Sequence, residues 1–591
     1  MSMLRSTSIS AAIALAFAVA APAAAQVMRA PSEAMRSDTP VAAPVTWRAT
    51  SAASAVPQVR LLPMAPERIQ AVQRHNARTQ QRRLQVGIER HLSSESAEAL
   101  PALDWQPTAG GSVAALDVVA PGASGLRVGL RADRLPAGVE LRVAGAAFSD
   151  DVYLVAAAEA GQQVDGDGLY WTAATDGERQ RLELFAPDGV DAAGLVLAVE
   201  AVSHLLVAPQ GGQFTPQGLG DSGACNIDVV CRANDLGGPF LQAKNAVARM
   251  LFQSGAGTFE CSGTLLTDLD TTTQTPWFFT ANHCIGNQTE ASTLVTFWNN
   301  EAQICNVDAN GPNIQVASGA QLLYSQPSTD GALLRLNGTP PAAAVFAGWN
   351  RFPMDPSTPV VTIHHPQGDI KKVSLGNHSG SSANVNIEGQ VVGSAFRASW
   401  SEGTTERGSS GAGLFTSGDD GYELRGGLFG GAASCANTGQ SEANGNVDYY
   451  SRFDLIYPAI EQYIGTPGGN GGPTRDYTGQ WDVASEGGRG LSLFQFGVGS
   501  PNNVLFGLWF IYDSQGRAAW YQIDPSWTGQ DVASGRVVRW VGSPWGPTYD
   551  PAARSFVETG TFTLTFTSGT AATLAYNVDG VNRTVTLRKL Q

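Results

Sequence analysis

Three residues of this chain have the side-chain types that together hydrolyse an amide bond. His283 stands in the segment TANHC, Asp330 in STDGALLRL and Ser410 in RGSSGAGLF. In such a reaction a serine hydroxyl attacks the carbonyl, an imidazole takes its proton, and a buried carboxylate fixes the imidazole tautomer and stabilises its cation. Asp330 follows His283 by 47 residues and precedes Ser410 by 80, in one of the three known chain orders of such a triad. We therefore predict a catalytic triad.

The sequence around each of these residues suits its task. His283 follows the apolar run WFF, which predicts the end of a buried strand, and Asp330 precedes the run ALL, so its carboxylate is expected to enter an apolar interior. Gly408 lets the backbone turn so that its own N–H and that of Ser410 point together at the oxyanion that develops during attack. Taken singly, these patterns are common as a core histidine, a turn cap and a flexible loop. Their combination indicates a site.

Strands and turns are the elements expected to position this site. The chain is 43% hydrophobic and 15% charged, with 67 glycines among 591 residues, which favours a β-rich and loop-rich protein. We predict an all-β dominated fold. The formal net charge of -15 argues against nucleic acid and anionic membranes as partners.

The first residues have the pattern of a signal peptide. Arg5 supplies a positive charge, an apolar stretch follows, and three alanines precede Gln26 as a cleavage site. No later stretch approaches the ~20 apolar residues that a membrane span needs. We therefore expect an exported, secreted protein.

Composition and cysteine placement divide the chain further. A linker rich in Gly, Pro and Gln ends near residue 219, and a glycine-rich linker follows residue 464. The predicted parts are 1–25, a signal peptide; 26–219, a β-rich region; 220–464, the region of the triad; 465–476, a linker; and 477–591, a small all-β module rich in tryptophan.

All six cysteines lie in the region of the triad. An even number of cysteines confined to one part of an exported chain indicates three disulfides, for which six cysteines allow 15 pairings. Five residues separate the first two cysteines, which is wider than the usual zinc-knuckle spacing and argues against a metal. The six are Cys225, Cys231, Cys261, Cys284, Cys305 and Cys435.

Three further histidines receive no catalytic or metal role. His364 and His365 are adjacent in a predicted strand, and adjacent strand side chains point to opposite faces, so they cannot easily bind one ion together. His378 has no partner pattern. We expect neither a metal nor a cofactor.

Beyond the triad, residues 220–464 resemble chymotrypsin-fold serine proteases, specifically the bacterial lysyl endopeptidase branch. Residues from about 85 to 206 are similar, more loosely, to the propeptide of that branch. The resemblance implies two six-stranded β-barrels with the triad between them, a precursor whose residues 26–219 are a propeptide acting as folding aid or inhibitor, and cleavage of proteins or peptides after basic residues. The matching segments are GACNIDVVC, FFTANHC, FWNN, STDGALLRL, FAGWNR, IHHPQGD, GSSGAGLF and DYYSRFD.

The same resemblance implies how the cysteines pair. The cysteine after the catalytic histidine is bonded to one on a preceding strand, which braces the loop that carries the base. The implied pairs are Cys261 with Cys284, Cys225 with Cys435, and Cys231 with Cys305.

The specificity pocket is implied less directly. Asp448, in the segment before RFD, occupies the position of the aspartate that pairs with a substrate ammonium in the lysyl branch. Phe429 stands where the branch has a histidine, and the tryptophan of its pocket has no match in SSANVNIEGQVV. We predict Asp448 and Phe429 as substrate-binding residues, for lysine with arginine as the alternative.

Activation presents a difficulty. No lysine or arginine occurs between Arg181 and Arg232, although the mature chain is expected to begin near Gly220. Either another protease releases the enzyme, which we favour, or its pocket is broader than Asp448 indicates.

Two other functions fit the sequence. The triad could serve a pocket for small or apolar side chains led by Phe429, or the protein could be a secreted surface-binding protein that uses the fold as a scaffold. Clustered tryptophans in 477–591 are more often a small β core than a carbohydrate platform. We expect a monomer.

Overall fold

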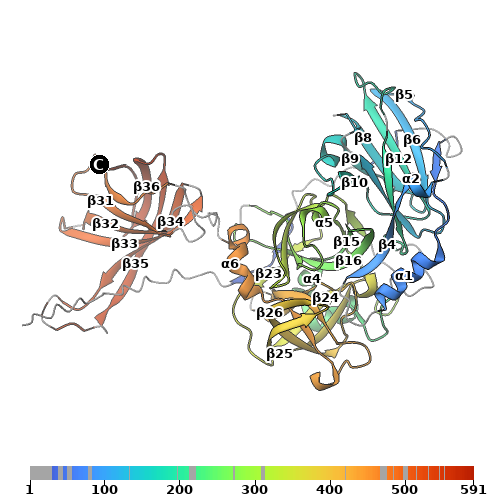
Figure 1. Ribbon diagram of the computed structural model, residues 1–591. Coiled ribbons are helices and arrows are strands. Elements are labelled where there is room, and N and C mark those ends of the chain that lie inside the picture. The colour runs from blue at the N-terminus through green and yellow to red at the C-terminus, as the bar shows by residue number, and fades with distance from the viewer. Residues whose placement is uncertain are drawn as a thin grey trace, which may run out of the picture.

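The computed structural model describes residues 29–36, 44–48, 56–77, 83–211, 221–465, 475–496 and 504–590, apart from residues 97, 132–133, 137, 196, 271–272, 308–312, 419–420, 484, 514, 530, 545, 547 and 551–552. Strands dominate it, so the predicted all-β fold class is confirmed (Figure 1). The predicted signal peptide and the expected start of the mature chain near Gly220 lie outside the described residues. No helix of the described part is long and apolar enough to cross a membrane.

Six strands close into a barrel that carries the C-terminal half of the triad region. They pair in the order β28, β27, β24, β25, β26 and β29, and β29 pairs back with β28. Glu388 and Gly389 join β25 to β26 and both have positive φ, as a type I′ hairpin turn requires. The bounds are β24 Pro359–His364, β25 Lys372–Ile387, β26 Gln390–Glu402, β27 Gly413–Gly418, β28 Gly421–Gly431 and β29 Asp448–Tyr450.

The strands before this barrel form the other half. They pair in the order β19, β18, β15, β16, β17, β21 and β20. Nearly every residue of β15 and β16 is buried, since both faces of these strands are covered. The bounds are β15 Val247–Ser254, β16 Gly257–Leu266, β17 Trp277–Ala281, β18 Val295–Trp298, β19 Ile314–Val316, β20 Ala320–Gln326 and β21 Gly331–Leu336.

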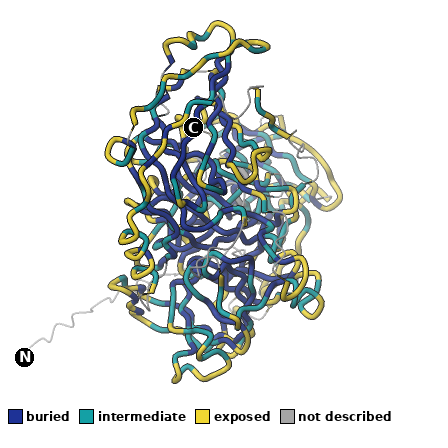
Figure 2. Tube along the Cα trace, turned by 90° about the vertical axis from the view of Figure 1, so that its right-hand side faces the viewer, coloured by how far each residue is buried: buried dark blue, intermediate teal, exposed yellow. Residues whose placement is uncertain are grey.

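A helix at the end of this region covers the two halves. The helix α6 (Phe453–Ile464) buries Phe453, Ile456, Tyr457 and Ile460, whose spacing of three and four residues forms one apolar face. These side chains belong to the same core cluster as Phe279 of β17 and Phe415 of β27. The core between the halves is therefore continuous. Figure 2 shows that buried residues run through the interior of the molecule and that exposed ones lie at its periphery.

The N-terminal region shares a sheet with the region of the triad. Its strand β4 (Leu84–His91) pairs on one edge with β13 (Val199–Leu205) and on the other with residues 257–260 of β16. A further contact comes from β1 (Arg29–Ala30), which pairs with β23 (Gly348–Asn350). The two regions therefore meet through backbone ladders as well as side chains.

The C-terminal residues form a separate closed barrel of eight strands, drawn apart from the rest in Figure 1. Trp481, Trp509 and Trp527 are buried inside it, whereas Trp520 is half exposed. The clustered tryptophans therefore include a core, as predicted, and Trp520 lies at the surface. The bounds are β30 Gly479–Val483, β31 Gly490–Phe496, β32 Val504–Tyr512, β33 Ala518–Gly529, β34 Val532–Val541, β35 Ser555–Phe566, β36 Ala571–Val578 and β37 Val581–Lys589.

Candidate active site

His283 and Asp330 meet because neighbouring strands carry them. His283 follows β17, Asp330 directly precedes β21, and the register pairs Ala281 with Gly331. Asp330 Oδ2 lies 2.9 Å and Oδ1 3.1 Å from His283 Nδ1, and Oδ1 accepts the backbone N–H of His283 at 3.0 Å. Gln390 Nε2 donates to the same oxygen at 3.1 Å. Because the carboxylate faces Nδ1, a neutral ring carries its proton there and leaves Nε2 as the basic nitrogen.

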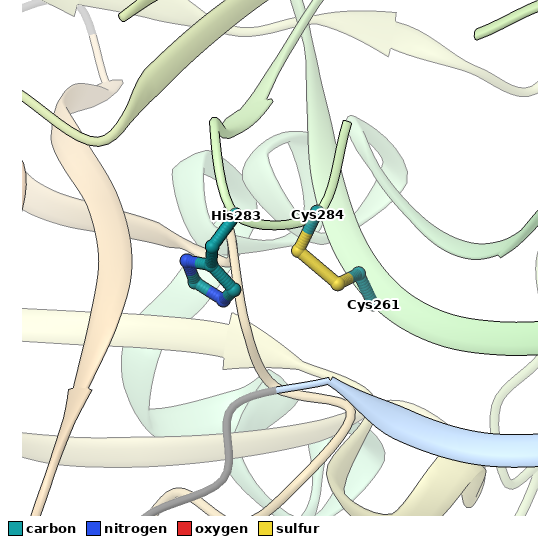
Figure 3. Close-up of side chains that lie close together, drawn as sticks. All are labelled: Cys261, His283 and Cys284. Atoms are coloured by element: carbon teal, nitrogen blue, oxygen red, sulfur yellow. A yellow bond between two sulfur atoms is a disulfide. The ribbon is translucent and has the colours of Figure 1, made fainter. Parts of the chain in front are cut away.

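A disulfide braces the turn that carries His283. Cys284 is bonded to Cys261 of β16, and Figure 3 shows His283 and Cys284 leaving the same short turn in different directions. Cys261, His283 and Cys284 have potential metal-ligand atoms within 4.8 Å of one another. Since the two sulfurs are bonded to each other, neither is a thiolate that could bind a metal.

The other two disulfides join the pairs that the family resemblance implies. Cys225 is bonded to Cys435, and Cys231 to Cys305. The first links the beginning of residues 221–465 to the segment between β28 and β29. No free cysteine occurs among the described residues.

Ser410 lies on the loop between β26 and β27, against the strands that lead to His283. Its carbonyl accepts the N–H of Ser262, the residue after Cys261 in β16, at 2.8 Å. Gly411 has a φ of +78°, and a Cβ there would lie 2.2 Å from Thr280 Oγ1 of β17. Only glycine therefore allows this close approach, which brings the serine loop to the end of the strand before the imidazole.

A hydrogen bond to the carbonyl of Arg407 fixes the peptide unit between Arg407 and Gly408. The carbonyl of Arg407 accepts the N–H of Gln367 at 2.5 Å. Because C=O and N–H point in opposite directions across a trans peptide, this bond turns the N–H of Gly408 to the other side of the loop. Gly408 has a φ of +83°, and a Cβ there would lie 2.7 Å from the carbonyl oxygen of His365.

The peptide unit before Ser410 is fixed in the same way. The carbonyl of Ser409 accepts the N–H of Ala412 at 2.9 Å, so the N–H of Ser410 faces away from that bond. Each of the two predicted oxyanion donors therefore belongs to a peptide unit whose carbonyl is fixed by a backbone hydrogen bond.

Asp448 is a fully buried carboxylate at the start of β29. Trp400 Nε1 and Thr405 Oγ1 each donate to its Oδ2 at 2.7 Å. Burial raises its pKa from 3.8 to about 6, although these hydrogen bonds favour the charged form. Among the described residues no cation forms an ion pair with it, so a negative charge there is uncompensated by the protein's own side chains.

Phe429 lies beside the imidazole of His283. The ring centroids are 6.2 Å apart in an edge-to-face arrangement. Phe429 is fully buried and packs in an apolar cluster with Ile387 and Val392. The structure therefore places this predicted substrate-binding residue behind the histidine, as part of the core.

Two residues at the site were not predicted from the sequence. Trp400 bonds to Asp448 because β26 and β29 are paired, with Ala398 opposite Asp448. His364 lies directly behind the serine loop, 2.7 Å from the hydroxyl of Ser409. The sequence carried one signal for each: a tryptophan just before the loop, and a histidine ending an apolar strand.

Comparison with known protein families gives two matches. The family model described as lysyl endopeptidase, C-terminal domain, matches residues 219–451, and the one described as lysyl endopeptidase N-terminal domain matches residues 60–206. A curated lysyl endopeptidase of Pseudomonas aeruginosa is 34% identical over 393 residues, which cover 64% of this chain and 81% of that protein.

Solved structures give weaker matches. A thermostable serine protease AL20 from an extremophilic microorganism is 14% identical and covers 38% of this chain and 96% of its own, with a TM-score of 0.27. A variant of the HtrA-type protease AlgW with a tripeptide is 14% identical and covers 59% of this chain and 95% of its own, also with a TM-score of 0.27. Similarity this weak says nothing about the chemistry of the present chain.

Proposed function

Since the chain belongs to the lysyl endopeptidase family and is a serine endopeptidase, we propose that it is secreted as a precursor and cleaves proteins or peptides after basic residues, lysine foremost. Asp448 carries this proposal. Its carboxylate is fully buried and has no cationic partner among the described residues.

A lysine or arginine before the scissile bond would supply the missing charge. An ammonium beside Asp448 would compensate the burial of the carboxylate, whereas an apolar side chain would leave the charge buried and unpaired. Trp400 and Thr405 hold one carboxylate oxygen in place. The pocket would therefore select for a cation, and the position of Phe429 in the core gives no support to a pocket for apolar side chains.

We assign the reaction to the triad. Ser410 attacks the carbonyl, and Nε2 of His283 takes the hydroxyl proton and later gives it to the leaving amine. Asp330 holds the ring through Nδ1 and stabilises the imidazolium that forms. The arrangement of the His283 turn, between its disulfide and Asp330, supports this assignment.

The N–H groups of Gly408 and Ser410 would hold the oxyanion. Both peptide units are anchored by their carbonyls, so little reorganisation is needed when the charge develops. Such preorganised donors are the main source of transition-state stabilisation in acyl transfer.

We propose that residues 26–219 are the propeptide and 220–464 the protease domain, with 465–476 as a linker to an accessory domain at 477–591. The contacts of the N-terminal region support this division. Arg249 donates to the carbonyl of Pro209 at 2.5 Å, and Arg407, next to Gly408, donates to the carbonyl of Asn76. A region that covers β16 and touches the serine loop is suited to act as folding aid or inhibitor.

A peptide library with every residue at the position before the cut tests the specificity. The wild-type enzyme should cleave after lysine, with arginine second, and the isosteric Asp448→Asn variant should lose this preference. A wild-type profile dominated by apolar residues would overturn the proposal. Cleavage after lysine by both proteins would show that Asp448 does not determine it.

Release of the propeptide is tested separately. Because the linker near Gly220 lacks basic residues, the wild-type precursor should stay uncut in a host without proteases, as should a Ser410→Ala precursor. Intact masses of the two proteins report the outcome. Cutting of the wild type alone would mean that the enzyme cleaves its own linker and that the pocket is broader.

A further inference from the structure

One loop carries most of the proposed catalytic machinery, and a buried histidine lies behind it. The loop between β26 and β27 holds Thr405, the partner of Asp448, as well as Gly408 and Ser410. His364, the last residue of β24, is fully buried against it. We propose that His364 is a positioning residue, which holds this loop in its catalytic shape through the hydroxyl of Ser409. The inference deepens the proposed function and rests on it.

His364 joins the loop to the neighbouring strand through both ring nitrogens. Its Nδ1 lies 2.7 Å from Ser409 Oγ, and its Nε2 lies 3.2 Å from Ser374 Oγ of β25. Ser374 Oγ donates to the carbonyl of Thr404 at 2.8 Å, and the N–H of Glu406 donates to Ser409 Oγ at 3.1 Å. The chain of hydrogen bonds thus begins and ends on the same loop.

The donors and acceptors of this chain fit only one tautomer. Ser374 gives its proton to the carbonyl of Thr404, so it must accept a proton from Nε2 of His364. A neutral ring with its proton on Nε2 has an acceptor at Nδ1, which Ser409 serves as donor. Ser409 Oγ in turn accepts from the N–H of Glu406. Every hydrogen bond is then satisfied without a charge.

Burial keeps the ring in this state. Desolvation, with a smaller contribution from Lys372, lowers the pKa of His364 to about 3. The imidazole is therefore neutral in ordinary working conditions.

Ser409 is the residue through which this network reaches the chemistry. Its own carbonyl belongs to the peptide unit that carries the N–H of Ser410, and its N–H belongs to the unit that begins at Gly408. Rotation of the Ser409 backbone would therefore turn the peptide unit that carries the N–H of Ser410, as well as the unit that follows Gly408. The hydroxyl of Ser409 donates to the imidazole of His364 and accepts the N–H of Glu406, and these two hydrogen bonds resist that rotation.

Three substitutions of His364 separate positioning from bulk stability. His364→Asn keeps an acceptor toward Ser409, His364→Gln keeps a donor toward Ser374, and His364→Ala keeps neither. We expect kcat per titrated active site to fall about 10- to 100-fold in the Ala and Gln variants, less than for loss of an oxyanion donor. KM should change little, and the Asn variant should recover much of kcat.

The matched control is His378→Ala. His378 is also a buried histidine, but it lies in the middle of β25, where its Nδ1 is 2.9 Å from the carbonyl of Asp355 and its ring packs edge-to-face against Phe396. Its substitution should lower the melting temperature and leave kcat per active site unchanged. Equal losses of kcat in the His364→Ala and His378→Ala variants would overturn the proposal.

A variant of Ser409 covers the case in which His364→Ala does not fold. Ser409→Ala removes the hydroxyl and keeps the ring, so it should show the same loss of kcat and of the rate of inactivation by a fluorophosphonate. Unchanged kcat in Ser409→Ala would overturn the proposal. Preference for lysine before the cut should persist in both variants, which distinguishes this result from failure of the proposed specificity.

Discussion

The two closed barrels of this chain both have apolar cores and differ in the polar side chains that they bury. The barrel of the triad region buries polar groups next to its core, among them Asp448, His364 and Ser409. The C-terminal barrel is filled by aromatic side chains such as Trp481 together with aliphatic ones such as Leu574, and the polar side chains that it buries are the uncharged Ser492, Gln495 and Gln522. Burying a polar group is costly unless it is hydrogen-bonded. Among the described residues of these two barrels, the buried carboxylates and imidazoles lie in the barrel of the triad region, where the proposed chemistry is.

The two barrels also differ in how they are held together. All three disulfides lie in the region of the triad, whereas the C-terminal barrel contains no cysteine. The latter closes on itself through β30 and β37, so it leaves no edge strand unpaired. The difference predicts that perturbations of one barrel will leave the other largely unaffected.

The largest expected effect is on activity alone. Ser410→Ala should reduce kcat by about 10⁶-fold, as the loss of a triad serine does elsewhere, because nothing else attacks the carbonyl. The melting temperatures of the triad region and of the C-terminal barrel should equal those of the wild type. Turnover of a lysine-containing peptide and differential scanning calorimetry measure the two quantities. Residual activity above a thousandth of wild type would exclude Ser410 as the nucleophile.

The next largest effect should be confined to the C-terminal barrel. Trp481 is buried, donates to the carbonyl of Tyr477 at 3.0 Å and packs against Phe566. Trp481→Ala should destabilise this barrel by about 3 to 5 kcal/mol and leave kcat unchanged. Trp520→Ala, at a half-exposed position of the same barrel, is the matched control and should change its stability by under about 0.5 kcal/mol. A fall in kcat with Trp481→Ala would show that the barrels are coupled.

Removal of disulfides should lower the stability of the triad region and leave that of the C-terminal barrel unchanged. Replacing Cys261 and Cys284 together with alanine should cost about 3 kcal/mol in the chain-entropy model and also lower kcat, because the turn of His283 loses its brace. The control pair, Cys231 and Cys305, closes a longer loop away from the imidazole and should cost about 4 kcal/mol without lowering kcat per active site. If both pairs reduce kcat alike, the brace has no special role.

The smallest effect concerns Asp448 and pH. Its folded pKa of about 6 lies above the unfolded value of 3.8, so the folded state binds the proton more tightly and loses stability as pH rises between these values. Asp448→Asn should therefore be more stable than the wild type at pH 7, by at most about 3 kcal/mol, and no more stable below about pH 4. Urea denaturation at the two pH values measures this. A variant less stable at pH 7 would mean that the hydrogen bonds to the carboxylate outweigh its burial.

The features of the site that depend only on neighbouring residues could be predicted from the sequence. The strand ends at His283 and Asp330, and the glycine turn at Ser410, were predicted because each is written in a few consecutive residues. The roles of Trp400 and His364 were not, because they depend on which strands pair and on what lies behind a loop. Alternation predicts which face a strand residue takes, and it does not predict the partner on that face.

The strand β4 pairs with a strand that lies far later in the chain. Ile88 pairs with Gly257, 169 positions later, and such distant strand pairs form slowly because a long loop must close first. Synthesis runs from the N-terminus, so β4 exists as a template before β16 is made. A chain that had lost its N-terminal region would have to re-form β16 without that template. If the N-terminal region is removed as proposed, the lifetime of the remaining enzyme would then be governed by its rate of unfolding more than by its equilibrium stability.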